Sequence, residues 1–213
     1  NYFARDAGGE IFYRITPNLV SSTTFNTDFA ETEVDTRQTN LTRFSLFFPE
    51  RRGFFLEDAG VFEFGSGSST GGGGGGGGRV RRRSVDLLPF FSRRIGLVEV
   101  EDENGDVETA EVPIRVGEKL TGKVGRFDLG LMDVQTGSSE GIQDANLAVG
   151  RVKANFWKQS YIGALFTNGN PEGSVSNHVE GVDMRLATAN FLNRGKSFFI
   201  TAFGTRSKTA GVN

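Results

Sequence analysis

Acidic side chains at alternate positions are the first group in this 213-residue chain that could do chemistry. Glu31, Glu33 and Asp35 would share one face of an extended strand, and oxygen-rich clusters of this kind can hold Ca²⁺. No glycine-punctuated calcium loop surrounds them, and a hard-metal site needs further ligands that converge from elsewhere. We therefore expect these carboxylates to pair with nearby arginines such as Arg37 and Arg43, and calcium is the alternative.

Residues for catalysis are scarce. His178 is the only histidine, the chain has no cysteine, and no G-x-S-x-G serine elbow is present. We expect His178 to be an ordinary loop residue between two strands. The glycine run at 71–78 is not a phosphate loop, because it lacks the "GK[ST]" ending and a following helix. No carboxylate pair is singled out for glycoside hydrolysis. We predict no catalytic residue and no cofactor.

A basic run follows the glycines and consists of Arg79, Arg81, Arg82 and Arg83. Such a run could contact the anionic sugars and phosphates of lipopolysaccharide. The favoured interpretation is a solvated loop that keeps the glycine tract soluble. The formal net charge of only -2 gives no electrostatic case for nucleic acid as a partner.

Four charges alternate with apolar residues in the second half of the chain. Arg151 and Lys153 lie in "NLAVGRVKANF", and Asp183 and Arg185 lie in "GVDMRLATANFL". In an extended strand each pair points to one face, while apolar neighbours point to the other. We expect these four side chains to line a polar interior.

The elements that must position these residues have a period of two, which is typical of strands. Segments of about 9 to 12 residues end in turn residues, longer than the usual strand of about five or six and close to the ~9–11 residues of a tilted membrane strand. About eight such segments are recognisable, two near the N-terminus and six after Glu118. The pattern predicts an all-β fold, an antiparallel transmembrane β-barrel or part of one, over residues 1–213.

Two insertions are expected within this domain. Residues 66–83 form a flexible loop rich in glycine and arginine, and residues 97–114 form an acidic β-hairpin centred on Asn104-Gly105. The charges of the hairpin are unfavourable in a membrane strand, so we expect it to project from the barrel rim.

The segment "NLTRFSLFFPERRGFFLEDAGVFEFG" mixes seven phenylalanines with several charges. Rings could pack on small residues of the barrel wall while Glu50, Arg51, Arg52, Glu57 and Asp58 pair with charges of the interior. Pro49 excludes a continuous central strand, and a short helical turn from Glu50 to Ala59 could be capped by Gly60. A structural aromatic segment is the favoured interpretation, and a functional plug or gate is the alternative.

This segment and the residues before it resemble a family, namely the outer-membrane barrel domain of unknown function that commonly follows a family-9-like carbohydrate-binding module in Gram-negative bacteria. The resemblance extends through "FFSRRIG", "KLTGKVGRFDLGLMDVQT" and "IGALFTN", with Thr27 and Gly53 where the family often has proline. The motif positions that match are Asp28, Phe29, Asn40, Arg43, Phe44, Phe47, Phe48, Pro49, Glu50, Arg52, Phe54, Phe55 and Glu57.

The resemblance implies an outer-membrane location and a pore or surface platform of structural or transport type, without a known substrate. Its implied partners are outer-membrane lipid and lipopolysaccharide. The alternative function is the membrane anchor of a surface carbohydrate-binding or carbohydrate-active protein, whose sugar-binding module would lie upstream of this chain. We expect the chain to be a fragment of the longer protein.

Overall fold

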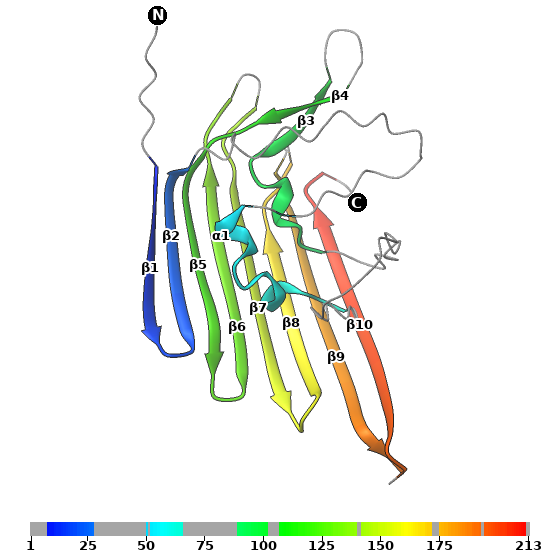
Figure 1. Ribbon diagram of the computed structural model, residues 1–213. Coiled ribbons are helices and arrows are strands. Elements are labelled where there is room, and N and C mark those ends of the chain that lie inside the picture. Colours follow the sequence, from blue (N-terminus) through cyan, green and yellow to red (C-terminus); the bar gives the residue numbers. More distant parts are fainter. Residues whose placement is uncertain are drawn as a thin grey trace, which may run out of the picture.

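The computed structural model describes residues 8–27, 50, 52–65, 89–101, 107–139, 142–171, 175–192 and 194–211. Most of these residues lie in one antiparallel sheet (Figure 1). Its strands, in spatial order, are β1 (Gly9–Thr16), β2 (Leu19–Thr27), β5 (Ile114–Val124), β6 (Phe127–Thr136), β7 (Asn146–Phe156), β8 (Ser160–Asn168), β9 (Asn177–Phe191) and β10 (Lys196–Thr209).

Every neighbouring pair in this sheet is antiparallel. All neighbours are consecutive strands of the chain except β2 and β5. The prediction of an antiparallel β protein with long strands is therefore confirmed. β1 and β10 are the two edges, and the described residues do not join them, so the sheet seen here is open.

The two ends of the sheet differ in their connections. Tight turns at 17–18, 125–126, 157–159 and 192–195 lie at one end, which is the lower end in Figure 1. At the other end, β2, β6 and β8 lead into longer connections, 28–113, 137–145 and 169–176. The second sheet, β3 (Leu97–Glu101) and β4 (Val107–Glu111), is an antiparallel hairpin above this end (Figure 1). It lies within the predicted 97–114 hairpin, whose turn falls outside the described residues, as does the 66–83 loop.

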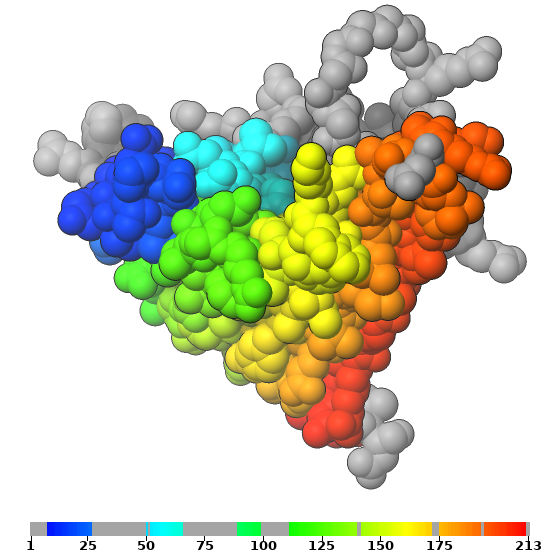
Figure 2. Space-filling model, turned by 90° about the horizontal axis from the view of Figure 1, so that it is seen from below, coloured from blue at the N-terminus to red at the C-terminus, as the bar shows by residue number. Residues whose placement is uncertain are grey.

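The phenylalanine-rich segment lies across one face of the sheet. We call residues 50 and 52–65 the inner segment, the sheet face that it contacts the covered face, and the opposite face the open face. Figure 2, viewed from below, shows the inner segment in cyan between the blue β1–β2 hairpin and the yellow strands. The core between segment and sheet consists of Phe54, Phe55, Phe62, Phe64, Ile95, Ile114, Met132, Val134, Leu147, Val149 and Leu165.

The helical part of the inner segment differs from the single turn that the sequence predicts. Gly53–Leu56 forms a four-residue helix, α1, and Ala59–Phe62 forms a separate 3-10 turn, η1. Asp58 adopts the left-handed conformation between them, with φ of 56°. Gly60 lies inside η1 and caps nothing, so that part of the prediction is wrong. A second 3-10 turn, η2 (Ser92–Arg94), lies between the two insertions in the sequence and contacts the inner segment.

Candidate functional site

Three phenylalanine rings of the inner segment contact glycines of the covered face. A Cβ built on Gly117 of β5 would lie 3.2 Å from ring carbons of Phe54. On Gly130 of β6 it would meet the Phe62 ring at 2.9 Å, and on Gly181 of β9 the Phe64 ring at 2.7 Å. Any side chain at these positions would push a ring away. The glycines therefore form a row of shallow seats in which the inner segment rests.

Two side chains of β5 form hydrogen bonds with the end of helix α1 and the residues that follow it. The Lys119 side chain is 2% exposed, and its Nζ donates to the carbonyl oxygens of Phe54 and Glu57 at the end of the helix, the latter at 2.9 Å. These carbonyls have no partner within a helix of four residues, so a cation there serves as a cap. At the next residue of the inner segment, the Asp58 carboxylate oxygen Oδ2 accepts a hydrogen bond from Thr121 Oγ1 at 2.8 Å.

A buried ion pair holds the other end of the inner segment. Arg151 of β7 is 0% exposed and Asp183 of β9 is 3% exposed, with Arg151 Nη1 2.7 Å from Asp183 Oδ1. The second carboxylate oxygen accepts hydrogen bonds from Arg151 Nη2 at 2.8 Å, from the Tyr161 hydroxyl at 3.2 Å and from the Gly65 amide at 3.0 Å.

Space for this pair comes from a glycine on the strand between β7 and β9. A Cβ on Gly163 of β8 would lie 2.7 Å from Arg151 Nη1 and 2.8 Å from Asp183 Oδ1. The Arg151 guanidinium also lies 5.3 Å from the centre of the Phe64 ring, a favourable cation–π position. Because a buried charge is costly without its partner, the pair and the seated segment depend on each other.

The start of the inner segment is tied to η2. The Arg52 guanidinium donates to both Glu50 carboxylate oxygens at 2.9 Å and to the Ser92 carbonyl oxygen at 2.7 Å. The Ser92 hydroxyl donates to Glu50 Oε2 at 2.7 Å. Burial acts to raise the pKa of the Glu50 carboxyl, but the hydrogen bonds and charge of Arg52, with the Ser92 bond, together hold this pKa below its ordinary value of 4.5. We call Glu50, Arg52 and Ser92 the latch.

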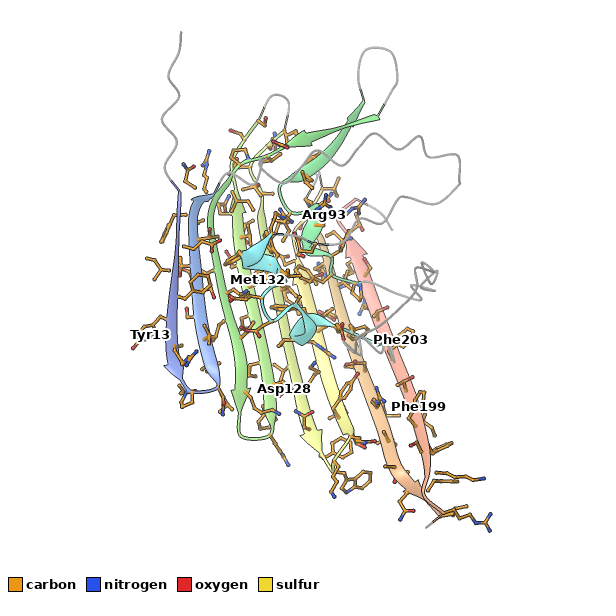
Figure 3. All side chains as sticks on the ribbon, in the orientation of Figure 1. Tyr13, Arg93, Asp128, Met132, Phe199 and Phe203 are labelled. Atoms are coloured by element: carbon orange, nitrogen blue, oxygen red, sulfur yellow. The ribbon has the colours of Figure 1, made fainter. Side chains whose placement is uncertain are left out.

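A strip of half-buried and exposed side chains continues on the covered face below the inner segment. Lys153 Nζ donates to the Gly60 carbonyl oxygen at 3.4 Å and lies 5.9 Å from the Tyr161 ring. Tyr161 is paired directly with Arg185 across β8 and β9. The Arg185 guanidinium lies 5.2 Å from the Phe199 ring, and Phe199 is 57% exposed on β10 (Figure 3). This strip combines cations with aromatic rings, a surface suited to anionic solutes.

The four charges expected in a polar interior thus share the covered face but have different surroundings. Arg151 and Asp183 are sealed beneath the inner segment, whereas Lys153 and Arg185 are partly accessible. Alternation could assign them to one face, but it could not distinguish a structural pair from accessible cations. Burial by a segment about a hundred residues away in sequence makes that difference.

Other predicted residues have varied outcomes. His178 is the second residue of β9, opposite Lys208 and Asn168, so its prediction as a loop residue is wrong; the strand begins earlier than the turn residues before it suggest. Of the family motif, Glu50, Arg52, Phe54, Phe55 and Glu57 are described and belong to the inner segment. The other motif positions, the calcium candidates Glu31, Glu33 and Asp35, and the basic run at 79–83 lie outside the described residues.

Sequence reasoning missed the residues on the sheet that receive the inner segment. Lys119 and Thr121 were not singled out. The seats at Gly117, Gly130 and Gly181 recur in three separate strands, and a glycine inside a strand often marks the close approach of another group.

Comparisons with protein-family models, with curated proteins and with solved structures find no match for this chain. Among the described residues, no cluster of three or more histidines or carboxylates is placed to hold a metal ion. Within the same part of the chain, no helix is both long and apolar enough to cross a membrane.

Proposed function

We propose that this chain forms part of an outer-membrane β-barrel of a Gram-negative bacterium, a pore or surface platform of structural or transport type whose interior is occupied by the inner segment. The observation that carries the proposal is the contrast between the two faces of one sheet. Apolar side chains are exposed on the open face, while charged side chains are buried on the covered face.

The open face contributes apolar side chains from all eight strands, each at least a third exposed to its surroundings. They are Ile11, Tyr13, Ile15, Phe25, Val124, Phe127, Leu131, Val152, Ile162, Phe166, Val182, Met184, Phe198 and Ile200. Tyr13, at the edge of the sheet, points away from the inner segment (Figure 3). Soluble monomers rarely expose contiguous apolar patches beyond a few hundred Å², whereas lipid is the favourable surrounding for such a face.

Charged residues on the open face are confined to one end. Glu118 and Asp133 are paired across β5 and β6, and Glu180 is opposite Arg206 across β9 and β10, all toward the long connections. Between this boundary and the tight turns, the described open-face positions carry no charge. An uncharged band of this kind is the pattern of a sheet that crosses hydrocarbon.

The covered face supports an interior that is packed rather than empty. The inner segment is bound by Lys119, Thr121, Arg151 and Asp183 and fills the glycine seats. The partly accessible cations Lys153 and Arg185 lie below it. If the interior passes a solute, these two residues are the ones that would act on it, with a preference for anions.

The test of the barrel is made on the full-length gene product in the outer-membrane fraction. We expect a folded band on SDS gels that shifts on heating, because closed barrels resist the detergent until they are boiled. A soluble protein without such a shift would contradict the proposal.

Ion selectivity then tests the interior. Lys153→Glu and Arg185→Glu are compared in planar bilayers with Glu118→Gln, a matched control on the open face. We expect the two reversals to lower anion preference and the control to leave it unchanged. Unchanged selectivity in a conducting protein would exclude the transport role of this strip.

A further inference from the structure

Arg185 of β9 carries hydrogen-bond donors that the described residues leave unused. A guanidinium has five N–H donors in a planar fork. None of those of Arg185 bonds to a described residue, and its Nε is buried. Arg151, on the same face, shows the contrast, because both of its Nη atoms contact the Asp183 carboxylate, at 2.7 and 2.8 Å. Arg185 is therefore a cation to which this part of the chain supplies no anion.

The carboxylate nearest to Arg185 in the strand does not neutralise it. Asp183 lies two residues away on the same face, and its oxygens are engaged by Arg151, by the Tyr161 hydroxyl and by a backbone amide. The direct neighbours of Arg185 across the sheet are Tyr161 on β8 and Thr201 on β10, and neither is a carboxylate. An anion that pairs with Arg185 must come from outside the described residues.

Aromatic rings lie beside this unpaired cation. The Phe199 ring centre is 5.2 Å from the Arg185 guanidinium, and Phe199 is 57% exposed (Figure 3). On the other side, Tyr161 is held by its hydroxyl, which donates to Asp183 at 3.2 Å. We call Tyr161, Arg185, Phe199 and Thr201 the acid site. An exposed ring next to an unpaired cation favours a ligand that is both apolar and anionic.

We propose that the acid site binds an aromatic carboxylic acid, with the carboxylate on the Arg185 fork and the aromatic body against the Phe199 ring. The inference rests on the proposed function, because it names the class of solute that the interior would receive. A planar guanidinium matches the two oxygens of a carboxylate, and Thr201 supplies a hydroxyl on the neighbouring strand. An inorganic anion would leave the Phe199 ring uncovered, and a neutral aromatic compound would leave Arg185 without a counter-charge.

Binding of benzoate tests the charged half of the site. The full-length protein in detergent micelles, checked for its heat-shifted band, is titrated calorimetrically with benzoate, acetate and benzyl alcohol, and micelles without protein give the background. We expect benzoate to bind more tightly than the other two, since only benzoate offers both the carboxylate and the ring. Arg185→Gln should weaken benzoate binding by on the order of tenfold to a hundredfold, the loss expected for charge-assisted hydrogen bonds.

Two phenylalanine variants test the apolar half. Phe199→Leu should weaken benzoate binding by about threefold to tenfold and leave the weaker binding of acetate unchanged. Phe198→Leu is the matched control, because Phe198 is the adjacent residue of the same strand and is 44% exposed on the open face. The control should change the binding of neither acid.

The outcomes separate this inference from the proposed function. Benzoate that binds no better than acetate, or equally well after Arg185→Gln, would overturn the acid site whether or not the heat shift is present. Equal effects of Phe199→Leu and Phe198→Leu would overturn the contact with the ring, and with it the assignment of an aromatic acid. A missing heat shift would contradict the barrel alone, and benzoate binding that depends on Arg185 would still support the acid site.

Discussion

The covered and open faces are built from the same eight strands, yet one buries polar side chains and the other exposes apolar side chains. On the covered face, charged and hydroxyl side chains are buried, and each of Lys119, Thr121, Arg151 and Asp183 bonds to the inner segment or to another wall residue. On the open face, residues from every strand leave large apolar groups exposed and unpacked.

This difference determines how selective each face is for the group that contacts it. Polar groups in a low-dielectric setting are unfavourable unless every partner is present, so the covered face can accept only a segment that offers the right carbonyls, amides and rings. The open face contains no such requirement, because lipid tails make no directional bonds. Mutations on the covered face should therefore depend on their partners, and those on the open face on the surrounding medium.

The largest expected effect is at the buried pair. Asp183→Leu leaves Arg151 charged and unpartnered and also removes the acceptor for the Gly65 amide, so we expect a loss of about 3–5 kcal/mol in the free energy of unfolding. Urea unfolding, followed by the heat-shifted band, measures it.

Two controls sharpen that prediction. The double variant Arg151→Met/Asp183→Leu should be milder than the single change, because no isolated charge remains. Asp128→Asn, at a more exposed ion pair on the same face, should cost about 1 kcal/mol or less. An Asp183→Leu variant as stable as Asp128→Asn would show that the pair does not hold the inner segment.

The open face responds to the medium. Ile162→Arg, at a position 54% exposed on β8 and opposite Met184 in the middle of β9, should destabilise the folded protein in bilayers by about 2–4 kcal/mol. Asn168→Arg, at the end of the same strand, should cost about 0–1 kcal/mol. If the face were in water, an exposed substitution at residue 162 would stay within about 0.5 kcal/mol. Equal midpoints for the two variants in lipid vesicles would therefore argue against the membrane band.

The glycine seats should give a smaller effect. Gly130→Val would drive a methyl group into Val61 and Phe62, and overpacking of this kind costs about 1–3 kcal/mol. Gly204→Val is the control, because a Cβ there meets nothing within 4 Å. We expect limited proteolysis to cleave the inner segment faster in the first variant only. The same cleavage rate in both would show that the segment does not depend on its seats.

Much of this arrangement could be predicted from the sequence, and the reason is the period of two. Alternation in "NLAVGRVKANF" and "GVDMRLATANFL" places Arg151, Lys153, Asp183 and Arg185 on one side, and all four lie on the covered face. The unusual mixture of rings and charges likewise drew attention to the inner segment before any contact was known.

The rest depends on contacts between distant residues, which periodicity does not contain. Nothing local tells that Asp183 accepts from Gly65, 118 residues earlier, or that Asp58 rather than Gly60 takes the left-handed conformation. In the sequence, the glycine seats are strand positions without a side chain. The reason for them is visible only in the fold, where phenylalanine rings pack against them. Closure of the sheet would require partners for the edge strands β1 and β10, and the described residues supply none. The barrel is therefore a proposal.

The latch should give the smallest effect and the only one that depends on acidity. Because the folded-state pKa of Glu50 lies below the ordinary carboxyl value of 4.5, its contribution to stability is present above that value and is lost as the pH falls through the lowered pKa. Glu50→Gln should therefore reduce the urea midpoint at neutral pH, and the difference from the parent protein should disappear in acid once the pH falls below the lowered pKa of Glu50. Glu118→Gln, on the open face, does not touch the latch and should follow the parent throughout. A Glu50→Gln difference that persists unchanged into acid would mean that the carboxylate charge is not what ties the inner segment to η2.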